Sequence, residues 1–238
     1  MHAGCYVGGT CVNSLSYADD MVLLAPSVSA LEKLLVHCET YALIHGLEYN
    51  TKKSEVLVFR AGNIKPYYVP PILLNSSPLK VVDKVKYLGH VLTSDLKDDL
   101  DIERERRALA VRSNMITRRF ARCSSDVKIT LFKSYCQSLY TSSLWIKYTK
   151  RAYNALRVQY NNAFRMLMGL PRRCSASGMF VAARTDSFQE IIRKNIVSLL
   201  SRVRCSPNSI LREIADRFDC PILHYWTKQI KSVAVYEI

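Results

Sequence analysis

Hydrophobic and polar positions divide the chain into a first part of mixed pattern and a second part that is helical almost throughout. Short extended segments joined by a tight turn are predicted at 12–16 and 21–25. Apolar residues then recur at helical spacing until Gly46 supplies a stop. Ser29 and Glu32 have the spacing of a capping box, which predicts the start of this helix.

Two more extended segments are predicted in the first part, at 56–59 and 85–92. The chain between them is confined to loop or edge structure by its prolines, which are Pro66, Pro70, Pro71 and Pro78. The order of two strands, a helix and two strands favours a sheet covered on one face by a helix. Because a helical second part follows this sheet, the sequence predicts a protein of the α+β class.

The first helix beyond residue 96 has two distinct sides at about 100° per residue. Its apolar stripe consists of Ile102, Leu109, Ile116 and Phe120. The opposite side carries four arginines, which are Arg104, Arg107, Arg118 and Arg122. The helix is therefore predicted to bury one side and to present four guanidinium groups on the other.

Further helices are predicted from the same period and from capping residues. They span 126–141, 150–168, 187–203 and 209–218. Gly169 and Pro171 end the second of these, and Asp186 is the expected cap of the third. The small polar stretch Cys174–Gly178 is a candidate linker.

Net charge separates the two parts more sharply than the periodicity does. The chain has 238 residues, of which 49% are hydrophobic, and a formal net charge of +14, so it is predicted to fold around a core. Residues 1–95 carry eight basic and eight acidic side chains, so the whole excess lies in 96–238. This distribution predicts a surface for a polyanion, the alternative being an ordinary solvated basic face.

Cysteine and hydropathy patterns narrow the class of protein further. The eight cysteines have no Cys-x-x-Cys spacing and are interpreted as free thiols rather than disulfides or zinc ligands. The chain opens without the pattern of a secretory signal and has no apolar stretch of membrane-spanning length. An intracellular protein, in the nucleus or the cytoplasm, is therefore predicted.

Asp19 and Asp20 are the residues that most clearly indicate chemistry. They lie in the predicted turn between two apolar segments, and like charges a few ångströms apart repel unless a cation neutralises them. Hard carboxylate oxygens suit Mg²⁺, and paired Mg²⁺ ions are how polymerases activate a 3′-hydroxyl and stabilise the leaving pyrophosphate. The alternative is a solvated turn in which the two aspartates only favour the bend.

Three motifs follow one another in the first part. They are Tyr17-Ala18-Asp19-Asp20, Gly46-Leu47-x-x-Asn50-x-x-Lys53-Ser54 and Lys86-Tyr87-Leu88-Gly89. In order and spacing they resemble the later half of the palm of a reverse transcriptase of the non-LTR (LINE-type) retrotransposons. The segment from Lys133 to Trp145 resembles the thumb of the same enzymes.

The resemblance implies three parts and one reaction. The parts are a partial right-hand reverse transcriptase palm of antiparallel sheet plus helix at 1–95, a helical thumb at 96–170 and a helical C-terminal extension at 171–238. The reaction is RNA-directed DNA synthesis by two-metal nucleotidyl transfer. Its implied partners are an RNA template, a DNA primer, deoxynucleoside triphosphates and Mg²⁺.

The resemblance also implies roles for individual residues of the palm. Asp19 and Asp20 would hold metal and the primer terminus, with Tyr17 near the primer end and the incoming nucleotide. Lys53 matches a basic residue that lies close to the triphosphate and assists the pyrophosphate as an acid. The alternative for Lys53 is a solvated lysine at the start of a strand.

Two further groups of residues receive nucleic-acid roles from the resemblance. Tyr87, Leu88 and Gly89 match the primer-grip turn, where a glycine lets the backbone approach the strand closely, although a plain strand end is the alternative. The arginines of the first helix in the second part would contact template-primer phosphates without regard to sequence.

Two departures from the family pattern limit the expected activity. A third palm carboxylate and the fingers belong upstream of the motif, yet sixteen residues precede Tyr17. The chain alone is therefore expected not to polymerise, and an exposed palm edge is expected to favour self-association. Alternatives from other classes are a non-catalytic basic nucleic-acid-binding module and an interaction protein derived from a retroelement.

Overall fold

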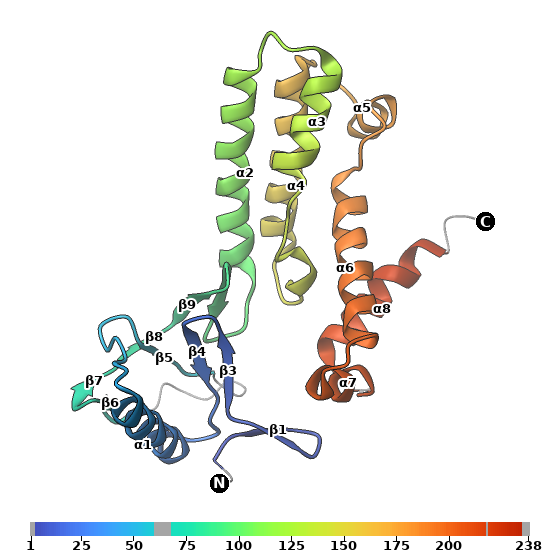
Figure 1. The fold of residues 1–238 in the computed structure, drawn as a ribbon. Helices are drawn as coiled ribbons and strands as arrows, with labels where there is room; N and C mark the ends of the chain where they lie inside the picture. Colours follow the sequence, from blue (N-terminus) through green and yellow to red (C-terminus); the bar gives the residue numbers. More distant parts are fainter. Residues whose placement is uncertain (1–2, 60–67, 218, 235–238) are drawn as a thin grey trace. The chain divides into compact units, whose positions relative to one another are not determined.

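A computed structural model describes residues 3–59, 68–217 and 219–234 of the chain (Figure 1). The predicted loop residue Pro66 and residue 218 of the helix predicted at 209–218 lie outside the described residues. The chain divides into two compact units. The first consists of Met1–Val85, Thr93–Asp95 and Pro207–Asp216, and the second of Lys86–Leu92, Leu96–Ser206 and Arg217–Ile238.

Strands of the first unit pair two by two. The antiparallel pairs are β1 (Cys5–Val7) with β2 (Thr10–Val12), β3 (Ser14–Tyr17) with β4 (Asp20–Leu23), and β6 (Leu73–Leu74) with β7 (Ser77–Pro78). The parallel pair is β5 (Glu55–Leu57) with β8 (Lys80–Val82). The protein is thus a mixture of helices and small sheets, compatible with the α+β class. Within the described ranges the strands form five two-stranded sheets in place of the single sheet that was expected.

Helix α1 (Val28–His45) covers the small core of the first unit. That core contains Leu35, Val56, Ile72 and Leu74. The side chain of Ser27 caps the helix by accepting a hydrogen bond from Ala30 N at 3.2 Å. The capping box predicted at Ser29 is therefore wrong, because Ser29 lies within the first turn. At the other end Gly46 adopts the left-handed conformation with φ 65°, as the sequence predicted.

The segment predicted as one strand at 85–92 is a hairpin. Strand β9 (Lys84–Tyr87) pairs with β10 (His90–Thr93), and Leu88 and Gly89 form the turn between them. Both turn residues have positive φ, 44° for Leu88 and 84° for Gly89, which reverses the chain after Tyr87.

The second unit is helical. Its elements are α2 (Asp99–Arg119), α3 (Ser125–Cys136), the 3₁₀ turn η1 (Ser142–Leu144), α4 (Lys150–Met168), α5 (Ala176–Ala182), α6 (Phe188–Arg204) and α8 (Pro221–Ala234). Helices α2, α3 and α4 pack on one another, while α6 packs on η1 and α8. Helix α7 (Ser209–Ala215) belongs to the first unit and contacts β1. No helix of the described residues has the length and apolarity needed to cross a membrane.

The apolar stripe of α2 forms the centre of this unit. Ile102, Leu109 and Ile116 are fully buried, which confirms three of the four predicted positions, while Phe120 is half-buried at the end of the helix. Aromatic rings from four helices complete the core, namely Phe132, Tyr160, Phe164, Phe180 and Phe188.

Several predicted boundaries differ from the structure, and the helix predicted at 209–218 already ends at Ala215 as α7. The helix predicted at 126–141 ends at Cys136, and the candidate linker at 174–178 instead leads into α5, whose cap is Ser175. Helix α6 is capped by Ser187 rather than Asp186, because Ser187 and Glu190 form a capping box.

Candidate functional site

The two aspartates of the Tyr17-Ala18-Asp19-Asp20 motif lie at the tip of the β3–β4 hairpin. Tyr17 pairs with Asp20, so Ala18 and Asp19 form a two-residue turn. Tyr17 and Asp20 are directly opposite each other and therefore share one side of the ribbon. All four residues are exposed, Tyr17 to 64%. The structure thus presents the motif at the end of an accessible hairpin.

The turn itself is strained. Ala18 has φ 53°, a conformation that glycine adopts without cost and that other residues adopt against a steric penalty. Positive φ at the first central residue is what a two-residue hairpin turn requires. Strain of this kind concentrates at functional sites, and it supports a function for the tip.

The edges of the hairpin carry no further strand among the described residues. Its base is tied by the hydrogen bond from Leu24 N to Asn13 O at 2.8 Å. Leu15 and Met21 are exposed large hydrophobic residues on the two strands. Unpaired strand edges with apolar side chains can accept another strand, as the predicted self-association requires.

The described residues do not supply a complete metal site at the tip. Mg²⁺ prefers an octahedral set of oxygen ligands. Nowhere in the described ranges do three His, Cys, Asp or Glu side chains converge on a point where they could hold an ion. Asp19 and Asp20 would therefore be only part of the donor set that the ion needs.

Lys53 lies in the first unit, in the turn that follows α1. The turn is closed by Asn50, whose Oδ1 accepts a hydrogen bond from Lys53 N at 3.1 Å and whose carbonyl accepts one from Ser54 N at 3.1 Å. The spacing of Asn50 and Lys53 is therefore explained by the turn that Asn50 closes. In the described part of the chain the exposed Lys53 side chain forms no ion pair with Asp19 or Asp20.

The Tyr87-Leu88-Gly89 turn belongs to the second unit. Leu88 is 53% exposed although its φ is 44°, so the leucine gains little from packing and has an unfavourable backbone conformation. A leucine at this position of a primed turn therefore has a local cost, whereas asparagine or glycine would not.

Replacement of Leu88 by asparagine is expected to raise the stability of the second unit by about 1 kcal/mol, because asparagine tolerates positive φ. A urea unfolding midpoint followed by tryptophan fluorescence measures the effect. Tyr140→Asn, at an exposed residue of the same unit whose φ is not positive, is the control and is expected to leave the midpoint unchanged. A lower midpoint for Leu88→Asn would show that the leucine side chain stabilises the turn.

The four predicted arginines are not equivalent. Arg104 donates to Asp101 at 2.8 Å and to Glu105 at 3.2 Å, so acidic partners on its own helix already engage it. Arg107 is 76% exposed at its side chain but pairs with Glu103 at 2.8 Å. Arg118 and Arg122 are exposed and, within the described residues, have no ion pair.

Asp101 is the centre of a buried polar network at the base of the helical unit. It is fully buried and accepts hydrogen bonds from Arg104 Nε, Thr141 Oγ1 and Trp145 Nε1, each at 2.8 Å. It also accepts one from Val91 N at 3.0 Å, which ties β10 to α2. Burial alone would raise the pKa of Asp101, but the groups that surround the carboxylate outweigh burial and hold its pKa well below the usual range.

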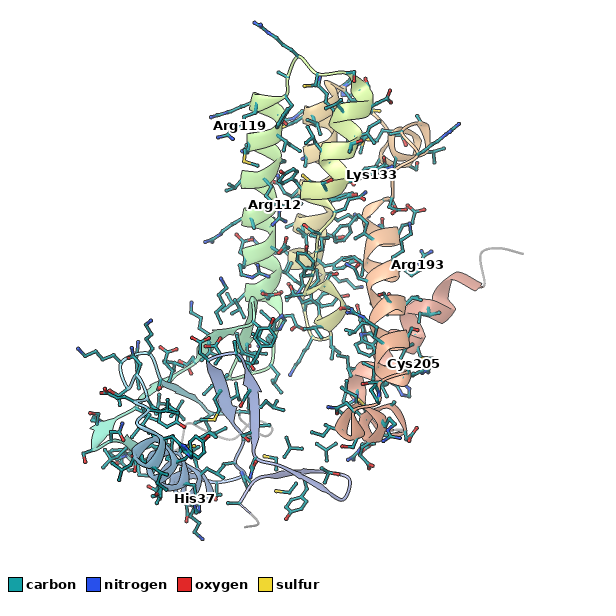
Figure 2. The ribbon with its side chains drawn as sticks, in the orientation of Figure 1. His37, Arg112, Arg119, Lys133, Arg193 and Cys205 are labelled. Carbon is teal, nitrogen blue, oxygen red and sulfur yellow. The ribbon has the colours of Figure 1, made fainter. Side chains whose placement is uncertain are left out.

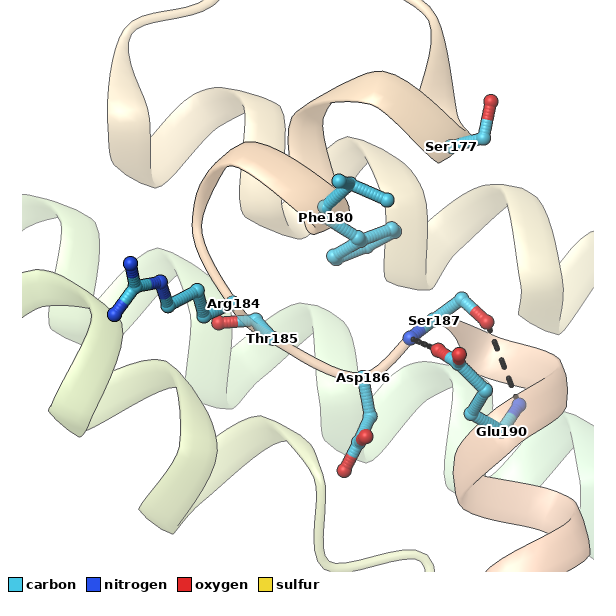
Figure 3. A pocket seen from close by; sticks show the side chains of 8 residues that line it. Ser177, Phe180, Arg184, Thr185, Asp186, Ser187 and Glu190 are labelled. Carbon is cyan, nitrogen blue, oxygen red and sulfur yellow. Dashed lines mark hydrogen bonds between the residues drawn. The ribbon is translucent and has the colours of Figure 1, made fainter.

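A pocket between α5 and α6 is lined by two carboxylates, Asp186 and Glu190, and by one exposed cation, Arg184 (Figure 3). Its wall includes the capping box, in which Ser187 N donates to the Glu190 carboxylate at 2.5 Å. Asp186 pairs with Lys194 at 2.6 Å. Both carboxylates of the pocket are therefore engaged in holding α6, and the pocket is accounted for by the structure of the helix start.

Three exposed arginines beside the ends of α2 and α4 are missing from the set predicted from the sequence. Arg119 ends α2, and Arg172 and Arg173 follow α4. The signal that could have found them is the pairing of arginines, Arg118 with Arg119 and Arg172 with Arg173, beside helix ends.

These observations describe a mixed α and β protein with an exposed Asp-Asp hairpin and a cationic helical unit. No protein-family model matches the chain. It is 28% identical over 168 residues to an uncharacterised transposon-derived protein of Caenorhabditis elegans. The match covers 69% of this chain and 59% of that protein, so the chain spans less than two thirds of its relative. The similarity points to a transposon origin.

Proposed function

We propose that the chain is part of a reverse transcriptase, an RNA-directed DNA polymerase, from a retrotransposon of the non-LTR type. The observation that carries the proposal is the exposed hairpin that places Asp19 and Asp20 at its tip, with a strained turn at Ala18. Similarity to a transposon-derived protein supports it. The order of the hairpin, a covering helix and a basic helical unit also agrees with a late palm followed by a thumb.

In this proposal the hairpin tip receives the 3′ end of a DNA primer on an RNA template. Asp19 and Asp20 supply two of the carboxylates for the Mg²⁺ ions of nucleotidyl transfer, and Tyr17 lies beside the primer end. Because the described residues hold no third ligand near them, we expect the chain alone not to extend a primer. The helical unit contributes phosphate contacts, since residues 96–238 contain the whole excess of positive charge.

The double variant Asp19→Asn/Asp20→Asn tests the position of the nucleic acid without depending on catalysis. In buffer with EDTA, two carboxylates beside a primer end repel its phosphates. We expect the variant to bind an RNA–DNA hybrid with a recessed 3′ end more tightly than the unchanged chain, by roughly three- to tenfold. Fluorescence anisotropy measures the affinity.

Glu32→Gln/Glu48→Gln is the matched control, because it removes the same charge from two exposed positions of the first unit. We expect it to change the affinity less than twofold. Equal affinities for both variants would place the aspartates away from the primer end. If binding itself persists, that result favours the second candidate, a non-catalytic nucleic-acid-binding module, which the incomplete donor set also permits.

A further inference from the structure

One end of the helical unit gathers five arginines, two from the last turn of α2 and three from the connections that follow α2 and α4. Helices α2 and α4 pack side by side and run in the same direction, so their C-terminal ends meet at one end of the unit (Figure 1). Figure 2 labels Arg119 there. We call these residues the arginine end: Arg118, Arg119, Arg122, Arg172 and Arg173.

The arginine end is cationic without compensation. All five side chains are exposed, and within the described residues none of them forms an ion pair. The connections 120–124 and 169–175 contain no acidic residue, and Asp126, in the first turn of α3, is the nearest along the sequence. Arginines on the side of α2 differ, because Arg104 and Arg107 are paired with acids.

Both connections are held in place. The Arg165 guanidinium donates twice to the carbonyl of Cys174, at 2.8 and 3.2 Å, which fixes the far side of the loop that carries Arg172 and Arg173. The loop after α2 is closed by the hydrogen bond from Cys123 N to Phe120 O at 3.1 Å. The charges are therefore carried on the end of α2 and on two defined loops, which lowers the entropy cost of binding a ligand.

Helix dipoles explain only part of this arrangement. Basic residues in the last turn of a helix offset the partial negative charge of its C-terminus, and Arg118 and Arg119 fit that explanation. The effect falls off within one turn. Arg122 lies beyond the end of α2, and Arg172 and Arg173 lie beyond the Gly169 cap of α4, so a different cause is needed for these three.

We infer that the arginine end binds the sugar-phosphate backbone of a nucleic-acid duplex. Guanidinium groups bind phosphate through paired hydrogen bonds and without regard to base sequence. The exposed hydroxyl residues Ser124 and Ser125 lie in the same connection and add donors for phosphate oxygens. The inference rests on the proposed function and deepens it, because it assigns the phosphate contact to the end of the helical unit rather than to the side of α2.

Two charge-removing double variants of the full chain test the assignment, Arg118→Gln/Arg122→Gln and Arg172→Gln/Arg173→Gln. The matched control is Arg202→Gln/Arg204→Gln, which removes the same charge from two exposed residues at the end of α6. Affinity for an RNA–DNA hybrid is measured by anisotropy between 50 and 200 mM salt. Circular dichroism checks that each variant is folded.

Each variant of the arginine end is expected to bind on the order of tenfold or more weakly at 0.1 M salt, and to lower the slope of log affinity against log salt by about 2, one for each lost contact. The control is expected to change affinity less than twofold. If both variants match the control, the arginine end does not bind the duplex, while the proposed function stands. If the unchanged chain binds without salt dependence, the proposed function fails as well.

Sedimentation with vesicles of phosphatidylserine and phosphatidylcholine separates a duplex from an acidic membrane surface. We expect the variants of the arginine end to lose affinity for the hybrid in preference to the vesicles. Loss of vesicle binding with unchanged affinity for the hybrid would assign these arginines to a membrane and overturn the inference.

Discussion

Replacement of Asp101 by asparagine is expected to lower the free energy of unfolding of the helical unit by about 3 to 5 kcal/mol, the usual cost of removing one partner from a buried ion pair. The amide keeps the shape of the carboxylate but loses its charge, which leaves the partly buried Arg104 without its closest acid. In either orientation its NH₂ group also faces an N–H that can only donate, that of Trp145 on one side or those of Arg104 and Val91 on the other.

Tryptophan fluorescence during urea unfolding measures this loss for the second unit alone. Both tryptophans of the chain, Trp145 and Trp226, belong to that unit and are buried. Glu103→Gln is the control on the same helix, because the Glu103 carboxylate is partly exposed and pairs with Arg106 and Arg107. We expect the control to cost less than about 1 kcal/mol. If both variants lose the same free energy of unfolding, the buried network stabilises the unit no more than the exposed ion pairs do.

The stabilisation of the second unit by the Asp101 carboxylate depends on pH, and the sign of that dependence follows from its pKa shift. Because the pKa of Asp101 is lowered by folding, its stabilisation is complete above the unfolded value of about 4 and is lost as the pH falls below it. Asp98 acts in the opposite sense, since burial raises its pKa, and ionisation of Asp98 therefore opposes folding. The difference between the unchanged chain and Asp101→Asn removes the contribution of Asp98 and is expected to shrink as the pH falls from about 4 to about 3. His90, whose Nδ1 lies 3.2 Å from Asp101 Oδ2, is the other titratable group that faces this carboxylate. A constant difference would contradict the assignment.

Replacement of Phe132 by alanine is expected to cost about 3 to 5 kcal/mol. The ring is fully buried and lies 4.9 Å from Phe164 and 5.1 Å from Tyr160, measured between ring centroids. These neighbours come from α4, so the cavity would open where α3 and α4 pack. Loss of edge-to-face ring contacts adds to the loss of buried area.

Tyr135→Ala is the matched control for Phe132, because Tyr135 lies on the same helix and is exposed. We expect it to change the free energy of unfolding by less than about 1 kcal/mol. The urea midpoint read from tryptophan fluorescence serves both variants. A loss below about 1 kcal/mol for Phe132→Ala would show that the aromatic core is loosely packed.

The local pattern of apolar and polar residues was enough to predict most helices, because the apolar period and the caps of a helix depend on residues that are close in sequence. Ile102, Leu109 and Ile116 are buried as expected, and Gly46 and Gly169 end their helices. Where two adjacent signals compete, pattern alone fails. Ser27 and Ser29 both have the chemistry of a cap, and the helix begins directly after the first of them.

Non-local contacts could not be predicted in this way. The parallel pairing of β5 with β8 joins segments separated by the whole proline-rich loop. Asp101 has the pattern of an ordinary acid in the first turn of a helix, yet its partners Thr141 and Trp145 are 40 and 44 residues away. The pairing of Arg104 with Asp101 and Glu105 is local by contrast, and its spacing along α2 was a signal that the sequence offered.

In the candidate site, the local hairpin could be predicted from the sequence, whereas the contacts between distant segments could not. The hairpin that carries Asp19 and Asp20 was predicted from a short motif between apolar segments, and the structure confirms the hairpin but not the palm sheet around it. Arg119, Arg172 and Arg173 were missed because their common feature is the end of a helical bundle, which exists only after α2 and α4 pack. A bundle end brings together residues that no single helix period relates.

Photocrosslinking from a primer terminus tests the central claim most directly. A DNA primer with 4-thiothymidine at its 3′ end is annealed to an RNA template, bound to the full chain and irradiated, and the labelled peptide is identified by mass spectrometry. A crosslink is expected in the peptide that contains Tyr17. Crosslinks confined to peptides of residues 96–206, with the hairpin peptide unlabelled, would contradict it.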